Sequence, residues 1–212
     1  MAKIINILTI FPDPVEAYLR EGMLRRASDK GLVEFNTVNI RDFSLNRHRK
    51  VDDIPYGGGP GMVMGVDVTV KALESLDKPG RKVLLSPSGK LFTRQDARRL
   101  GEDDLTLICG RYMGIDHRIR EFIDETVSVG EYILSGGELP ALTVAEAVTR
   151  LIPGVLGDER SLEEDRGYPI YTRPREFRGF KVPDVLLSGD RVRIKEFRER
   201  EAAYGKDDRY TD

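Results

Sequence analysis

Apolar residues recur along the chain in two alternating patterns. Strands buried on both faces of a sheet are predicted by apolar runs at residues 4–11, 33–40, 82–86, 105–109 and 126–129. Between these runs, apolar positions at helical spacing predict helices at residues 15–30, 67–76, 93–100, 115–123 and 139–151. Thr93 is the expected N-cap of the third helix. Alternation of this kind predicts an α/β domain with a mostly parallel sheet.

Three of the predicted strands run directly into loops that are rich in glycine and proline. These loops are Leu85–Gly89, Cys109–Tyr112 and Ser128–Gly137. Ligands of parallel α/β sheets bind beyond the carboxyl ends of the strands. If neighbouring strands carry the three loops, the loops surround one pocket.

The segment from Ser128 to Arg150 is the most informative of these. Its glycines, Gly130 and Gly136-Gly137, bracket an apolar tripeptide, and Pro140 leads into a helix that ends near Arg150. Glycine lets the main chain approach a ligand closely, and no lysine follows to hold phosphate. The segment therefore indicates a pocket for a flat heterocycle bound by main-chain atoms, although an ordinary strand–turn–helix connection has the same pattern.

A second glycine-rich loop, Tyr56–Met62, closes a long polar stretch that begins at Arg41. It is neither a P-loop, which needs Lys-Ser/Thr after the glycines, nor a dinucleotide fingerprint, which needs a strand just before it. Such a loop could cover a planar base, with Tyr56 or Pro60 contributing surface. A mobile surface loop is the alternative.

The amino-acid composition of the chain changes after Pro153-Gly154. Residues 158–167 are acidic and nearly free of apolar side chains, as in a flexible linker. A charged helix with few core residues is predicted at residues 190–203. We expect three parts: an α/β domain at 1–157, a linker at 158–170 and a small helical domain at 171–212.

Composition narrows the class of protein. The 212 residues include a single cysteine, Cys109, which excludes an internal disulfide and suits a reducing compartment. The apolar N-terminal run is too short to span a bilayer, so we expect a soluble, cytoplasmic protein. Net charge is −2, but basic residues cluster at 41–50 and 166–181. Either cluster could bind phosphate or simply be a solvated face.

Six motifs occur in order along the chain. They are Asp52–Met62, Leu85–Gly89, Cys109–Tyr112, Ser128–Pro140, Arg150–Gly157 and Tyr171–Pro174. Together they resemble the bacterial tRNA (guanine-N1)-methyltransferases that modify position 37, which belong to the knotted SPOUT class of S-adenosylmethionine-dependent enzymes. The resemblance covers nearly all of residues 3–190.

This resemblance implies a deep trefoil knot in the main domain, with S-adenosylmethionine bound in a bent form inside it. It also implies an obligate homodimer with the active site at the interface, a tRNA substrate and use of Mg²⁺, for which the sequence locates no site. The cofactor positions that match are Leu84, Leu85, Pro87, Gly110, Tyr112, Val129, Gly130, Tyr132, Leu134, Gly136 and Gly137.

For the tRNA, the resemblance implies that the loop Tyr56–Met62 lies near the target guanine and that the C-terminal helices help to bind the RNA. The corresponding residues are Tyr56, Gly57, Gly58, Gly59, Pro60, Met62, Thr172 and Arg173. By motif register Asp165 is the general base, and Arg150 stabilises charge on O6 of the guanine. From the sequence alone, Asp165 could equally be a solvated carboxylate and Arg150 a helix cap.

The chain departs from the family pattern at several positions. Met113 stands where the family usually has glutamate after Cys-Gly-Arg-Tyr, the linker is short, and Glu164 is the alternative base. The C-terminal domain is also short. Two other functions therefore stay open: a related knotted methyltransferase with another RNA target, and a non-catalytic RNA-binding module.

Overall fold

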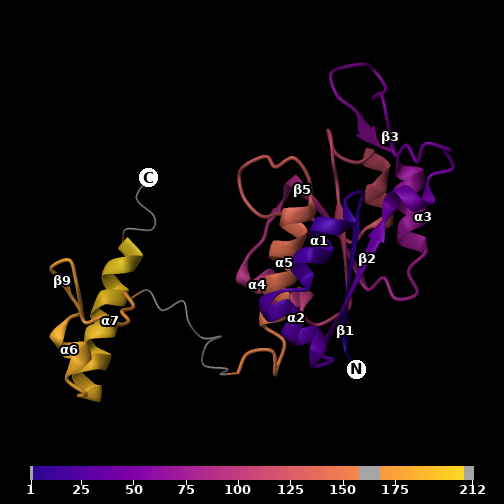
Figure 1. Cartoon of the computed structure of the whole chain (residues 1–212). Coiled ribbons are helices and arrows are strands. Elements are labelled where there is room, and N and C mark those ends of the chain that lie inside the picture. Colours follow the sequence, from indigo (N-terminus) through magenta and orange to yellow (C-terminus); the bar gives the residue numbers. More distant parts are fainter. Residues whose placement is uncertain (1, 158–167, 208–212) are drawn as a thin grey trace. The chain divides into compact units, whose positions relative to one another are not determined.

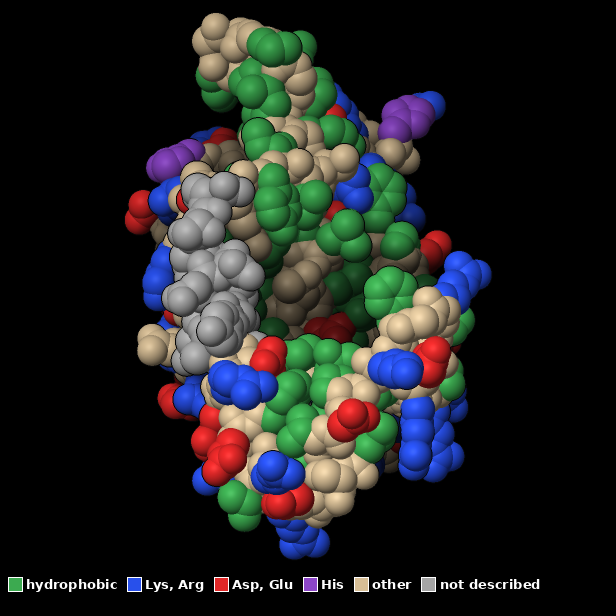
Figure 2. Space-filling model, turned by 90° about the vertical axis from the view of Figure 1, so that its left-hand side faces the viewer, with side chains coloured by type: hydrophobic (Ala, Val, Ile, Leu, Met, Phe, Trp, Pro, Cys, Tyr) green, Lys and Arg blue, Asp and Glu red, His purple; other side chains and the backbone are tan. Residues whose placement is uncertain are grey.

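The computed structural model describes residues 2–157 and 168–207 (Figure 1). Contacts between Cα atoms divide the chain into two units, Met1–Gly157 and Asp158–Asp212. The acidic stretch predicted to be a linker lies mostly outside the described residues. Across the face drawn in Figure 2, Lys and Arg side chains are interspersed with Asp and Glu, in keeping with the small net charge.

A five-stranded parallel sheet forms the centre of the first unit, in the order β2-β1-β6-β5-β7. The strands are β1 (Lys3–Thr9), β2 (Val33–Asn39), β5 (Arg81–Leu91), β6 (Leu105–Cys109) and β7 (Glu125–Ser128). The short strands β3 (Asp52–Asp53) and β4 (Val63–Met64) form a separate antiparallel pair. The predicted α/β class with a mostly parallel sheet is confirmed.

Helices cover both faces of this sheet. Successive side chains of each strand point to opposite faces, and the buried strands place apolar side chains on both, so each face has a core to cover. Leu107 of β6 belongs to a core shared with α1 (Pro12–Leu19), α2 (Gly22–Asp29), α4 (Arg94–Leu100) and α5 (Glu138–Arg150). Its neighbour Ile108 belongs to a core shared with α3 (Val66–Glu74), η1 (Ile40–Phe43) and η2 (His117–Phe122). Figure 1 shows α1, α2, α4 and α5 together on one side, away from α3.

The single helix expected at residues 15–30 is wrong, because the chain forms two helices there. Gly22 takes a φ of +57°, a conformation that interrupts a right-handed helix. The first helix also begins earlier than expected, at Pro12, because the first N–H groups of a helix have no intrahelical partner to lose. By contrast, the predicted N-cap of α4 is confirmed: the Thr93 hydroxyl accepts a hydrogen bond from the Asp96 N–H.

Strand β5 is longer than the predicted run at 82–86. It continues to Leu91, but Leu85 and Lys90 are both in register with Val127 of β7. The four residues between them therefore bulge out of the ladder. Gly89 ends this bulge against β7, where a Cβ atom would lie 2.6 Å from the main-chain nitrogen of Val127.

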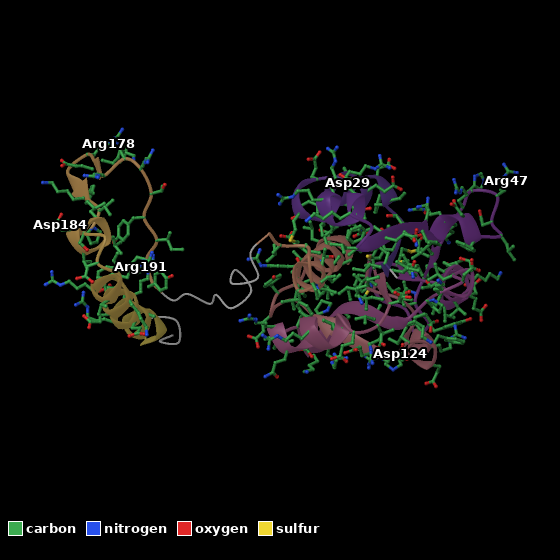
Figure 3. All side chains as sticks on the ribbon, turned by 90° about the horizontal axis from the view of Figure 1, so that it is seen from below. Asp29, Arg47, Asp124, Arg178, Asp184 and Arg191 are labelled. Atoms are coloured by element: carbon green, nitrogen blue, oxygen red, sulfur yellow. The ribbon has the colours of Figure 1, made fainter. Side chains whose placement is uncertain are left out.

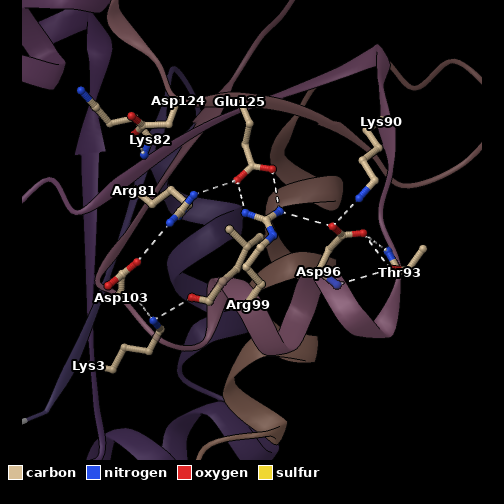
Figure 4. A network of polar contacts seen from close by, with 11 residues as sticks. Lys3, Arg81, Lys82, Lys90, Thr93, Asp96, Arg99, Asp103, Asp124 and Glu125 are labelled. Carbon is tan, nitrogen blue, oxygen red and sulfur yellow. Dashed lines mark hydrogen bonds and ion pairs between the residues drawn. The ribbon is translucent and has the colours of Figure 1, made fainter.

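A buried carboxylate connects this bulge to helix α4 and strand β7 (Figure 4). Asp96 accepts hydrogen bonds from Lys90 at 2.8 Å and from Arg99 at 3.3 Å. Arg99 in turn donates two bonds of 2.7 Å to Glu125. The Lys90 ammonium, above all, holds the pKa of Asp96 well below its usual range, so the carboxylate stays charged.

The second unit contains a β-hairpin in addition to the helices expected there. Strands β8 (Glu176–Phe177) and β9 (Phe180–Lys181) pair antiparallel, and α6 (Asp184–Leu187) and α7 (Arg191–Asp207) follow. Arg178 and Gly179 both have positive φ at the turn, which indicates a type I′ hairpin turn. Figure 3 shows Arg178 on the turn and Arg191 at the start of α7. In the described residues, no helix is long and apolar enough to cross a membrane.

Candidate active site

A pocket of about 420 Å³ opens at the bulge of β5 and beyond the carboxyl ends of β6 and β7. These three strands are neighbours in the sheet, so their loops surround one cavity, as the strand-end argument predicted. The structure brings all the predicted cofactor residues into the wall: Leu84, Leu85, Pro87, Gly110, Tyr112, Val129, Gly130, Tyr132, Leu134, Gly136 and Gly137. Their role in binding stays a prediction.

Glycines allow main chain from distant segments to meet in this wall. The N–H of Gly137 donates a hydrogen bond to the carbonyl of Gly110 at 2.9 Å. The main chains of Arg111 and Gly136 form an isolated antiparallel β-bridge. A Cβ atom on Gly130 would lie 2.2 Å from the ring of Tyr132. The glycines of the Ser128–Gly137 loop therefore serve close approach, which fits a flat ring held by main-chain atoms.

Sequence reasoning missed a buried polar cluster beside this pocket, centred on Glu138. The Glu138 carboxylate accepts hydrogen bonds from the Thr9 hydroxyl at 2.7 Å and from Nε of Arg111 at 2.9 Å. The guanidinium of Arg111 also stacks on the ring of Phe11, 4.5 Å from its centroid. The only sequence signals were a polar residue ending an apolar run and an acidic residue in the first turn of a helix.

Cys109, the single cysteine, lies fully buried next to this cluster. Burial raises the pKa of its thiol well above the ordinary value, and the nearby Glu138 carboxylate raises it further. A thiol rather than a thiolate is therefore present at neutral pH, and Cys109 is unsuited to act as a nucleophile.

The glycine loop Tyr56–Met62 is anchored at the rim of the pocket. The N–H of Met113, a wall residue, donates to the carbonyl of Met62 at 3.0 Å. Three consecutive glycines of the loop, Gly57 to Gly59, have φ values of +84°, +77° and +121°. Tyr56 is fully exposed. The loop therefore has one end fixed beside the pocket, whereas its tip is exposed.

The structure does not bring Arg150 to the pocket of its own chain. Gly137, at the start of α5, lines the pocket, and Arg150 is the last residue of that helix. At about 1.5 Å per residue, the two ends of α5 are about 20 Å apart. Asp165 and its alternative Glu164 lie outside the described residues. Thr172 and Arg173 are exposed in the second unit.

No cluster of three or more His, Cys, Asp or Glu side chains in residues 2–157 and 168–207 is arranged to hold a metal ion. The wall instead combines apolar side chains, main-chain groups and a few cations, among them Arg111 and Arg120. A parallel sheet with a pocket of this composition defines an α/β domain of the kind that binds small ligands at its strand ends.

Comparison with known proteins specifies the family. A family model described as tRNA (Guanine-1)-methyltransferase TrmD matches residues 3–211. A tRNA (guanine-N(1)-)-methyltransferase from Dictyoglomus turgidum is 50% identical over 206 residues, covering 93% of this chain and 84% of the relative. A tRNA (guanine-N(1)-)-methyltransferase from a strain of Thermus thermophilus is 48% identical over 204 residues, covering 93% of this chain and 85% of the relative.

Among solved structures, the crystal structure of tRNA (m1G37) methyltransferase from Aquifex aeolicus is similar with a TM-score of 0.86 and 36% sequence identity. The similarity covers 98% of this chain and 93% of that one. The chain belongs to the tRNA (guanine-N1)-methyltransferase family.

Proposed function

We propose that the chain methylates N1 of guanine 37 in tRNA in the cytoplasm, using S-adenosylmethionine. The observation that carries this proposal is the convergence of three of the six sequence motifs on one pocket. The predicted cofactor residues come from three separate loops, and all of them line that pocket. Family membership supports the same reaction.

The pocket suits the adenosine part of the cofactor. A volume of about 420 Å³ falls within the range usual for small-molecule sites. Because Gly130, Gly136 and Gly137 have no Cβ atom, a planar ligand can approach the main chain of the wall closely at these residues. S-adenosylmethionine supplies an electrophilic methyl group on a sulfonium. A trefoil knot around this pocket is implied by the resemblance.

Two groups complete the proposed chemistry. Guanine N1 carries a proton at neutral pH, so a base has to remove it as the methyl group arrives. Asp165 is our candidate for that base. Negative charge then shifts towards O6, and Arg150 is suited to stabilise it because a guanidinium stays charged and offers several N–H donors.

The position of Arg150 favours a homodimer. Because α5 separates Arg150 from its own pocket by about 20 Å, its proposed role requires the pocket of a second copy. An apolar groove on α1 and α5 is suited to that contact, and its exposed residues include Tyr132, Leu134 and Leu139. We therefore propose that two chains associate through this groove.

The second unit is our candidate for tRNA binding, together with the loop Tyr56–Met62. Thr172 and Arg173 precede a hairpin whose Phe177 and Phe180 are 61% and 81% exposed. Arg178 stacks on Phe177, with 5.2 Å between the guanidinium carbon and the ring centroid. Exposed aromatic rings among basic side chains are suited to stack on unpaired bases and to contact phosphates.

Mg²⁺ is expected only from the resemblance. The described residues offer no carboxylate cage for it, and we assign no step of the reaction to a metal ion.

Methylation of two tRNA transcripts that differ only at position 37 tests the function. We expect the transcript with guanine to be methylated at N1 and the transcript with adenine to remain unmethylated. Equal methylation of both would favour a related enzyme with another RNA target. Calorimetry with S-adenosylmethionine alone completes the test, because absence of binding would favour a non-catalytic RNA-binding module.

A further inference from the structure

Glu138 is a buried carboxylate that the proposed methyl transfer does not use. Its side chain is 7% exposed, and it lies in the first turn of α5, where the helix dipole stabilises negative charge. One of its oxygens is satisfied by Thr9 and the other by Arg111. A buried charge that is held by two specific partners is a costly feature to retain unless it positions something.

The residue that it positions is Arg111, a member of the pocket wall. Glu138 holds Nε of the guanidinium, and the ring of Phe11 supports its flat face. Gly136 makes room for this pair, because a Cβ atom there would lie 2.1 Å from Nε of Arg111 and 2.4 Å from the Glu138 carboxylate. The guanidinium is therefore fixed before any ligand arrives, which lowers the entropic cost of binding.

The ion pair with Glu138 uses only one of the five N–H donors of a guanidinium. The two terminal nitrogens carry the other four, in a geometry that matches a carboxylate with two parallel hydrogen bonds. S-adenosylmethionine contains one anionic group, the α-carboxylate of its amino-acid end. Arg120 and His117 also line the pocket, but both are exposed, whereas Arg111 is half-buried and anchored.

We propose that Arg111 binds the α-carboxylate of S-adenosylmethionine and that Glu138 is the positioning residue that orients it. This inference rests on the proposed use of that cofactor. It divides the pocket into two parts: the glycine loops hold the adenosine, and the Glu138–Arg111 pair fixes the amino-acid end.

The test compares two ligands by calorimetry without tRNA. Decarboxylated S-adenosylmethionine keeps the adenosine, the sulfonium and the amine but lacks the carboxylate. We expect the unaltered chain to bind it about 10- to 100-fold more weakly than S-adenosylmethionine, as for loss of charge-assisted hydrogen bonds. In Arg111→Ala the two ligands should bind with similar affinity, because only S-adenosylmethionine loses a contact.

Two further variants separate binding from folding. Arg120→Ala alters another cation of the wall and should leave the preference for S-adenosylmethionine unchanged. Glu138→Gln keeps the shape of the anchor but removes its charge, so we expect a reduced preference with unchanged affinity for the decarboxylated ligand.

Equal losses for both ligands in Arg111→Ala would make Arg111 structural and overturn the proposal, as would loss of the preference in Arg120→Ala instead. Failure of the unaltered chain to bind S-adenosylmethionine at all would count against the proposed function. Normal binding with no effect of Arg111→Ala would count against this inference alone.

Discussion

Gly137 stands directly against the main chain of Cys109: a Cβ atom on residue 137 would lie 2.7 Å from the Cα atom of Cys109. The two residues are far apart in sequence, one at the start of α5 and the other at the end of β6. Gly137 lines the pocket, as does Gly110, the residue that follows Cys109. Gly137 has an ordinary helical φ of −80°, so the requirement for glycine here is purely one of space.

Gly137→Ala should therefore destabilise the fold and weaken cofactor binding together. Overpacking of this kind costs about 1–3 kcal/mol, measurable as a lower midpoint of denaturant unfolding. Gly157→Ala is the matched control, because a Cβ atom at residue 157 meets nothing within 4 Å. Unchanged stability of Gly137→Ala would mean that the α5–β6 contact yields without cost.

Asp165→Ala tests the proposed base. We expect loss of methyl transfer with nearly unchanged affinity for S-adenosylmethionine, because removal of the N1 proton is needed for the reaction but not for binding. Single-turnover kinetics on a tRNA with guanine 37 measure the first quantity and calorimetry the second. A near-normal rate would transfer the role to Glu164 or to another group, and Glu164→Ala is the companion variant.

Arg150→Ala tests the proposed stabilisation of charge on O6. The single-turnover rate should fall about 10²- to 10³-fold, as when one donor to a developing oxyanion is removed. The affinity for S-adenosylmethionine should change little, because the proposed contact of Arg150 is with O6 of the guanine and not with the cofactor. Arg20→Ala, on an exposed turn after α1, is the control for a general loss of positive charge. A rate that Arg150→Ala leaves unchanged would reduce Arg150 to a helix cap.

The hairpin of the second unit is expected to contribute to tRNA affinity. Phe177→Ala and Phe180→Ala should each weaken tRNA binding about 5- to 100-fold if each ring stacks on a base. Arg178→Ala should instead reduce the slope of log affinity against log salt concentration by about 1, as for the loss of one phosphate contact. Val192→Ala on α7, where the side chain is 66% exposed, serves as the control. If all four variants bound tRNA as tightly as the unaltered chain, the hairpin would have no part in recognition.

Asp96 gives the stability of the first unit a dependence on pH. Its pKa in the folded chain is lowered, chiefly by Lys90, from an ordinary value of 3.8. The stabilisation is therefore complete above pH 3.8 and is lost as the pH falls below it, through the folded-state pKa. We expect Asp96→Asn to lower the free energy of unfolding at pH 7 by about 1.5–3 kcal/mol.

This difference should shrink progressively below pH 4. Denaturant unfolding from pH 7 down to pH 3 measures it, with the exposed Asp103→Asn as control. A difference independent of pH would show that Asp96 acts through its shape rather than its charge.

The linear pattern of residues was sufficient for the elements whose cause is local. The apolar run at 105–109 became β6 without change, and Thr93 capped its helix as expected. Both depend on side chains within a few positions of each other. The helix expected at 15–30 failed because its break at Gly22 is a backbone conformation, which the spacing of apolar residues does not report.

The sequence by itself determined the α/β class, through its apolar pattern, and the family resemblance, through contiguous motifs. That resemblance also predicted residues that line one pocket. Only the tertiary structure decided which strands are neighbours, and therefore that three motifs share one pocket. It also decided that Thr9, Arg111 and Glu138 form a cluster, and that Arg150 lies at the far end of α5 from its own pocket. Such relationships depend on how distant segments pack, and residue spacing along the chain carries no measure of that distance.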